Sequence, residues 1–205
     1  MDTSKRKLTV LDQISSSDKV RKTIIDTASI LYAKKGFRAT SIGEISEMAG
    51  VSLPVTYHYV KNKSEIMRMI MEDLLNTFRK NLIKEIKGKD DPEEKLVIAT
   101  ILYFRVVDQQ REKALLVYQK SSSLDKTSKS KVMQLEVEVS EIFCNIIEEG
   151  IRKKIFRKVD VDLMAYNIVM MAHMWALKRW HFKNRLTLDK YIDLQLTTIL
   201  GTLRK

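Results

Sequence analysis

Glycine, proline and cysteine are scarce in this chain of 205 residues, which contains six, two and one of them respectively. Average usage of glycine and proline is about 7% and about 5%, and turns between strands draw on both. Their scarcity argues against sandwiches, barrels and doubly wound sheets and favours long helices. The single cysteine, Cys144, excludes an intramolecular disulfide framework and fits a reducing compartment.

Long apolar runs are also missing. The longest, residues 97–104 and 168–177, are shorter than the roughly 20 residues that span a bilayer. The N-terminus carries basic residues but lacks the apolar segment of a secretory signal. We therefore expect a cytoplasmic protein with no membrane partner.

The usual motifs of enzymes do not occur: HExxH, GxSxG, a P-loop and GxGxxG are all absent. His173 and His181 are eight residues apart, which separates them by about 12 Å along a helix, too far to share one metal ion. Glu148 and Glu149 are adjacent and point in different directions. We expect no catalytic residue, no metal and no cofactor.

Positive charge is in excess: 37 Lys and Arg face 26 Asp and Glu, which gives a net charge of +11. Such an excess favours a polyanionic partner. The excess is spread along the chain, because residues 1–61 hold ten basic and six acidic side chains. Charge alone therefore leaves nucleic acid, an anionic ligand and a membrane surface open.

Helix signals are dense in residues 16–63, after a polar stretch, 1–15, that we expect to be flexible. Residues 16–18 offer N-cap oxygens, and Gly36 is suited to end the helix that follows. Ser41 and Glu44 have the spacing of a capping box. A short second helix then ends at Gly50, and Ser52 caps a third that runs to about Tyr59.

Two short helices joined by a three-residue turn that contains glycine form the pattern of a DNA-binding helix-turn-helix. In that motif the second helix offers its N-terminal residues to base edges in the major groove. Residues 53–59 contain no acidic side chain that would repel phosphate. They contain hydroxyl and phenol donors and apolar groups that suit a thymine methyl.

Residues 18–66 resemble the N-terminal domain of the TetR family of bacterial transcriptional regulators. The residues that carry the resemblance are Ala28, Leu31, Gly36, Phe37, Thr40, Ile42, Ile45, Ala49, Gly50, Val51, Ser52, Tyr57, His58, Tyr59, Lys63 and Ile66. Val60 departs from the pattern, since the family usually has Phe there. Residues 53–55 also replace a more usual small or polar stretch, which would alter the bases that are read.

The resemblance implies a set of DNA contacts. Thr40, Ser41 and Lys63 would contact phosphate, and Leu53, Pro54 and Thr56 would face bases. Tyr57 and His58 would contact the backbone or a base, with the helix start at Ser52 beside them. Tyr59 is better suited to the core.

The remaining residues predict helices at 64–87 and 93–108, a shorter helix that ends at about residue 120, and three more at 132–153, 162–182 and 188–203. A break at 88–92 and a loop at 121–131 separate them. The helices at 162–182 and 188–203 are apolar almost all round, so they must be covered on several sides. They would either form a four-helix interface with a second copy, as in the family, or fill a core within one chain.

Polar residues inside apolar runs, such as Arg105 within residues 101–107 and Asn167 and His173 within 162–182, indicate candidate ligand contacts, because buried polar groups need partners. The alternatives are that these polar side chains pair with other groups inside the protein or that they are exposed to solvent. The candidate ligand-binding residues are Tyr103, Arg105, Tyr118, Asn167, Met171, His173 and Trp175. Residues 175–191 are similar to the branch of the family that senses acyl-CoA thioesters, which makes a hydrophobic effector of that kind one candidate.

These observations predict an all-α protein with a helix-turn-helix DNA-binding domain at 16–63. A long helix joins it to an effector-binding and dimerisation domain at 64–205. The expected function is that of a homodimeric transcriptional repressor, released from a palindromic operator in double-stranded DNA by a small apolar effector. The alternative is a basic helical module that binds membrane surfaces or proteins without specific DNA binding.

Overall fold

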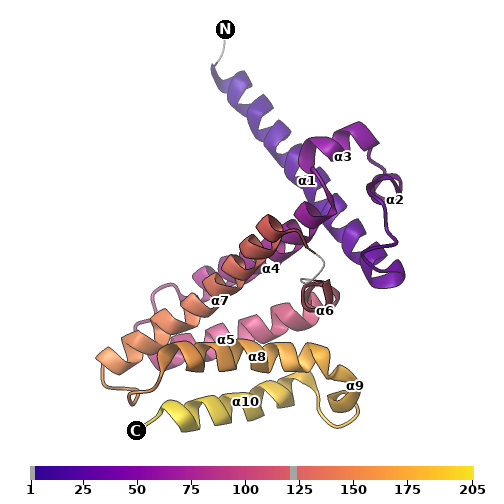
Figure 1. The fold of residues 1–205 in the computed structure, drawn as a ribbon. Coiled ribbons are helices and arrows are strands. Elements are labelled where there is room, and N and C mark those ends of the chain that lie inside the picture. Colours follow the sequence, from indigo (N-terminus) through magenta and orange to yellow (C-terminus); the bar gives the residue numbers. More distant parts are fainter. Residues whose placement is uncertain (1–2, 121–123) are drawn as a thin grey trace.

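The computed structural model describes residues 3–120 and 124–205, and this part of the chain is built of helices (Figure 1). The predicted all-α class is confirmed. The helices are α1 (Thr3–Lys35), α2 (Ile42–Met48), α3 (Leu53–Tyr59), α4 (Lys63–Ile86), α5 (Pro92–Gln109), α6 (Arg111–Lys120), α7 (Lys126–Arg152), α8 (Val161–Leu177), α9 (Arg179–Phe182) and α10 (Leu188–Leu203). No helix among them has the length and apolar content needed to cross a bilayer.

Three predicted boundaries are wrong. Helix α1 begins at Thr3 rather than at 16–18, because serine costs little inside a helix when no breaker interrupts it. Helix α7 begins at Lys126, inside the predicted loop, because Asp125 accepts a hydrogen bond from the Ser128 backbone and caps it. Residues 121–123 of that loop lie outside the described residues. The predicted helix 162–182 ends at Leu177 and resumes as the short α9.

Two hydrophobic cores share α4. The first packs α1–α3 against the N-terminal half of α4 and includes Ile24, Tyr32, Ile45 and Ile70. The second packs the C-terminal half of α4 against α5, α7, α8 and α10. In Figure 1, α4 runs from the α1–α3 region into the layer formed by α5, α7, α8 and α10. The long helix that the sequence predicted therefore joins the two regions.

The turn between α7 and α8 closes the second core. Lys154 adopts a left-handed backbone there, with φ of 62°. The buried ring of Phe156 packs directly on Gly150. The backbone of Arg157 donates to the carbonyl of Leu203, 2.8 Å away, and this bond ties the end of α10 to the turn.

Gly150→Ala is expected to destabilise the protein because the new methyl group would overlap the Phe156 ring. Overpacking of this kind costs about 1–3 kcal/mol. The measurement is the free energy of unfolding in urea. Gly43→Ala is the matched control, since its methyl meets only Ser41 Oγ at 3.7 Å, and it should gain up to about 1 kcal/mol. Equal stability of the two variants would contradict this packing.

Candidate nucleic-acid interface and effector cavity

The turn between α2 and α3 has the geometry of a helix-turn-helix. Ser41 and Glu44 form the predicted capping box at the start of α2. Gly50 has a φ of 65°, a left-handed conformation that is cheap only for glycine. The backbone N–H of Val51 then donates to the carbonyl of Ser46 at 3.0 Å and closes the turn. The chain is redirected within three residues into α3.

A buried pair of hydroxyl groups fixes α3 against α2. Ser46 Oγ donates to Thr56 Oγ1 at 2.9 Å, and Thr56 Oγ1 in turn lies 3.3 Å from the carbonyl of Ser52. The side chain of Thr56 is 0% exposed. Its predicted contact with bases is therefore incompatible with this geometry. Thr56 sets the orientation of α3 instead of facing the duplex.

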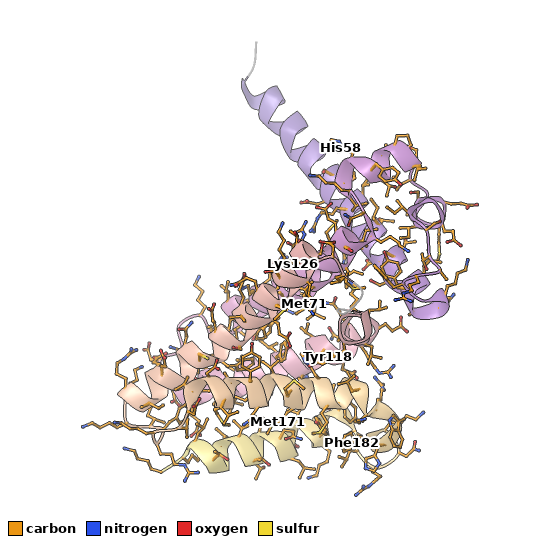
Figure 2. The ribbon with its side chains drawn as sticks, viewed as in Figure 1. His58, Met71, Tyr118, Lys126, Met171 and Phe182 are labelled. Carbon is orange, nitrogen blue, oxygen red and sulfur yellow. The ribbon has the colours of Figure 1, made fainter. Side chains whose placement is uncertain are left out.

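The outer face of α3 carries the candidate DNA contacts. Leu53, Val55 and Tyr57 are 43%, 43% and 52% exposed, and Pro54 and His58 are exposed as well. Figure 2 shows His58 on the outside of α3. The sequence analysis expected residues 53–55 to alter the bases that are read but did not name Val55 as an individual contact. The helical period was the available signal. Thr56 and the apolar Val60 are four residues apart and so lie on one face of the helix, which points inward, whereas Val55 lies off that face.

The half-buried Lys63 caps the segment that leads into α2. Its ammonium donates to the carbonyls of Phe37, Arg38 and Thr40 at 2.8, 3.1 and 2.8 Å, and it lies over the Phe37 ring. Thr40 is 1% exposed, and its hydroxyl donates to the carbonyl of Gly36. The predicted phosphate contact of the buried Thr40 side chain is incompatible with this geometry, whereas the phosphate contact of the half-buried Lys63 stays a prediction. Together the two residues fix the segment that leads into α2.

The rim of this region is electropositive. A shallow hollow lies between residues 37–43, α3 and residues 61–64, and exposed Ser41, Arg38 and Lys61 border it. Glu44 on α2 pairs with Lys35 at 2.7 Å. Hydrogen bonds from Lys35 and from the Ser41 backbone lower the pKa of Glu44 to about 2. The charge of Glu44 is therefore paired, which leaves Arg38 and Lys61 as the cations at the edge of the hollow.

A cavity of about 250 Å³ lies between α4, α6, α7 and α8. Figure 2 labels Met71 and Tyr118 in this region. The lining is mostly apolar, with a few polar groups, as is usual for small-molecule sites. The lining residues are Met71, Leu74, Ala114, Tyr118, Lys129, Val132, Met133, Glu136 and His173.

Three rings from α5, α8 and α6 form a hydrogen-bonded chain at the cavity. Tyr103 Oη lies 2.7 Å from His173 Nε2, and Tyr118 Oη lies 2.8 Å from His173 Nδ1. Burial lowers the pKa of His173 to about 4, so the ring is neutral and has one donor and one acceptor. Burial also raises the pKa of Tyr118 to about 12.

The donor and the acceptor in each of these hydrogen bonds can be assigned by requiring that every buried O–H and N–H has an acceptor. Among the described residues, the fully buried Tyr103 hydroxyl has only His173 as a partner, so it donates to Nε2. Nδ1–H then donates to the oxygen of Tyr118. The proton of Tyr118 is left for the Sδ of Met170, 3.0 Å away. The reverse arrangement would bury an unpaired Tyr103 O–H, which costs about 1–3 kcal/mol.

The other predicted ligand residues lie away from the cavity lining. Arg105 is exposed and pairs with Asp189 at 3.4 Å. Trp175 is buried, and its Nε1–H donates to Asp108 at 2.7 Å. Asn167 and Met171 border a separate groove on the outside of α8. The structure thus brings Tyr118 and His173 together at the cavity, with Tyr103 behind them.

Sequence reasoning missed Glu136 and Lys129, which line the cavity from α7. Glu136 is half-buried, and burial raises its pKa. Among the side chains that the structure describes, none forms an ion pair with it. Lys129 lies in the segment predicted to be a loop, so its helical register was hidden. A charged residue in the apolar face of α7 was the signal that could have identified Glu136.

Helix α6 connects the cavity to α1. Near its start, the buried ammonium of Lys113 donates to Asp26 of α1 at 2.8 Å and to Asp73 of α4 at 2.7 Å. Burial opposes the charge, but these bonds leave the pKa of Lys113 above its ordinary value. Tyr118 at the cavity lies five residues after Lys113, which is less than two turns of helix α6.

Two family models match the chain. The model described as bacterial regulatory proteins of the tetR family matches residues 24–70, and the Tetracyclin repressor-like C-terminal domain matches residues 89–184. The HTH-type transcriptional regulator HbdR of Aromatoleum sp. (strain CIB) is 31% identical over 173 residues, 84% of this chain and 76% of that protein. The chain belongs to the TetR family and is a DNA-binding transcriptional regulator. The alternative of a basic interaction module is not favoured.

Two further matches extend this comparison. The HTH-type transcriptional repressor KstR2 of Rhodococcus jostii (strain RHA1) is 23% identical over 175 residues, 83% of each protein. The crystal structure of AibR in complex with isovaleryl coenzyme A and operator DNA has a TM-score of 0.71 and 17% identity, and covers 87% of this chain and 97% of AibR. At this identity the likeness shows the fold alone.

The neutral state of buried His173 predicts a pH dependence of stability. An unfolded imidazole has a pKa near 6.5, whereas burial lowers that of His173 to about 4. Between these values the unfolded state binds the extra proton, so the free energy of unfolding falls as pH falls through that window. Lowering the pH from about 7 to about 5 should therefore reduce the free energy of unfolding of the wild type by about 2 kcal/mol more than that of His173→Gln.

Urea unfolding at the two pH values measures this difference. His181→Gln removes an exposed imidazole on α9 and is the matched control for the loss of a histidine. Identical pH dependence of the His173 variant and the wild type would contradict a neutral, buried imidazole.

Proposed function

We propose that the chain is a dimeric repressor that reads a palindromic operator with the outer face of α3 and is released by a small apolar effector. The exposed residues at 53–55 and 57–58, held rigid by the Ser46–Thr56 bond, carry this proposal. A symmetric dimer would place two such helices in successive major grooves, about 34–36 Å apart. This role requires no catalysis and places the protein with the chromosome in the cytoplasm.

An exposed stripe on α8 and α10 supports the dimer. On α8 the stripe has the helical spacing of residues 163, 167, 170 and 174, where Leu163, Met170 and Met174 are 61%, 43% and 36% exposed. On α10 it passes through Leu194, 46% exposed, and ends at Gly201, beside which lies open space. Figure 1 shows the two helices side by side on one face. Apolar stripes of this kind pack well against their own two-fold copy.

Helix α6 supports the link between effector and operator. A ligand that moves Tyr118 would shift α6, and Lys113 would carry the shift to Asp26 on α1. An effector can shift operator occupancy only by its differential affinity for the two conformations, typically about 1–3 kcal/mol. Small movements at the cavity would therefore suffice to change the spacing of the two α3 helices.

Tyr57→Ala is expected to weaken operator binding by about tenfold or more, since contacts to bases and backbone contribute about 1–3 kcal/mol each. The operator is first obtained by selecting genomic DNA with the purified protein. Affinity is then measured by gel shift at fixed salt, because phosphate contacts make it salt-dependent.

Trp180→Ala is the matched control for this measurement. It removes another exposed aromatic side chain, 69% exposed on α9 and remote from α3, and should leave operator affinity unchanged. Unchanged affinity in the Tyr57 variant would mean that α3 is not the recognition helix.

Leu163→Glu combined with Leu194→Glu is expected to convert the dimer to monomer, because burying unpaired carboxylates in an apolar interface is costly. Sedimentation velocity measures the change. Ile83→Glu adds the same charge at an apolar residue of α4 that is 69% exposed, and this variant should remain dimeric. A dimer that survives both substitutions on α8 and α10 would place the interface elsewhere.

A further inference from the structure

The first two turns of α7 carry three exposed lysines, Lys126, Lys129 and Lys131, which we call the α7 lysine cluster. Among the side chains that the structure describes, none forms an ion pair with a member of this cluster. Lys129 also lines the cavity, whereas the other two members do not. The positive charges of the cluster are therefore available to a partner outside the protein.

Packing places the α7 lysine cluster next to the start of α4. Leu124 and Val132, on either side of the cluster in the sequence, are buried in the core that contains α1–α3 and the N-terminal half of α4. Figure 2 shows Lys126 at the end of α7 that is nearest to the α1–α3 region. The cluster therefore lies at the DNA-binding end of the molecule, although α7 continues into the second core.

One contact connects the cluster directly to the candidate nucleic-acid interface. Asp125, the residue before the cluster, accepts a hydrogen bond from the backbone of Ser128 at 2.9 Å. Hydrogen bonds from Ser128 and from the side chain of Ser64 lower the pKa of Asp125. Ser64 is one of the residues that line the hollow beside α3. The cluster is therefore continuous with the surface that carries the candidate DNA contacts.

The positions of these lysines are electrostatically unfavourable for the protein alone. The N-terminal end of a helix carries partial positive charge, so cations in its first turn are repelled. Lys126 is the first residue of α7, and the first turn of α7 contains no acidic residue. A partner with dense negative charge would offset this repulsion.

A DNA duplex supplies such charge beside this end of the molecule. Double-stranded DNA carries one negative charge per about 1.7 Å of its axis. The exposed hydroxyl groups of Thr127 and Ser130 lie between the lysines, and hydroxyl groups donate to phosphate oxygens as cations do. A duplex bound to the outer face of α3 would pass the hollow that Ser64 lines, and the cluster lies next to that hollow.

We propose that the α7 lysine cluster is a second DNA-contacting surface, which binds backbone phosphates beside the groove that α3 enters. This inference rests on the proposed function and adds a contact between the effector-binding region and the operator. Phosphate contacts position a protein on the duplex but carry no sequence information. The cluster therefore strengthens binding to any duplex, while the choice of sequence stays with α3.

The test measures the affinity of the full-length protein for an operator duplex and for an unrelated duplex over a range of salt concentrations. Each lysine that meets a phosphate contributes about 0.9 to the slope of log K against log[salt]. The triple variant K126Q/K129Q/K131Q should bind both duplexes at least about tenfold more weakly at low salt and keep the ratio of the two affinities. Its slope should be smaller by about 2 or more, since a dimer carries two clusters.

A second triple variant, K158Q/K183Q/K190Q, is the matched control, because it removes three exposed lysines between α7 and α10 that are distant from α3. It should keep the affinity and the salt slope of the wild type. Thermal unfolding should show that the cluster variant is at least as stable as the wild type, since it relieves the repulsion in the first turn of α7.

Two results separate this inference from the proposed function. If the cluster variant has the affinity and the salt slope of the control variant, the α7 lysine cluster does not contact DNA and the inference is wrong. If the wild type binds the operator and the unrelated duplex equally well, the proposed reading of an operator by α3 fails instead. The slopes on the unrelated duplex then still decide whether the cluster binds phosphates.

Discussion

The ion pairs of Lys113 are the constraint on which the rest of the structure depends. One buried ammonium holds α6 to Asp26 of α1 and to Asp73 of α4. Removing one partner of such a pair leaves an uncompensated charge and costs several kcal/mol when the pair is buried. Helix α6 cannot move relative to the cavity without pulling on α1. These ion pairs therefore link the helix that lines the cavity to α1 and α4.

The same short helix is the route by which, as we propose, a small ligand acts on operator binding. Tyr118 on α6 is bonded to His173 and Met170 of α8, and Met170 belongs to the proposed dimer face. The cavity thus touches both the helix that orients α1 and the helix that orients the second protomer. Two conformations that differ by a few kcal/mol at these contacts suffice for a regulatory switch.

The sequence predicted the features that depend on neighbouring residues. The capping box, Gly50 and the bounds of α3 follow local rules, and they were found. Thr56 was misassigned because its surroundings are set by Ser46, which lies ten residues away in the sequence. Only part of the cavity lining was predicted from the sequence. Tyr118 and His173 were among the predicted ligand residues, whereas Lys129 was hidden in a segment predicted to be a loop and the charge of Glu136 in the apolar face of α7 was overlooked.

The most direct test of coupling through α6 is amide hydrogen exchange with and without an operator duplex, because coupling between two sites is reciprocal. Operator binding should slow exchange in α6, around residues 111–118, in the wild-type protein. The same amides should respond much less in Lys113→Met, although α3 still becomes protected. Exchange in α6 that is identical with and without operator in the wild-type protein would contradict the account.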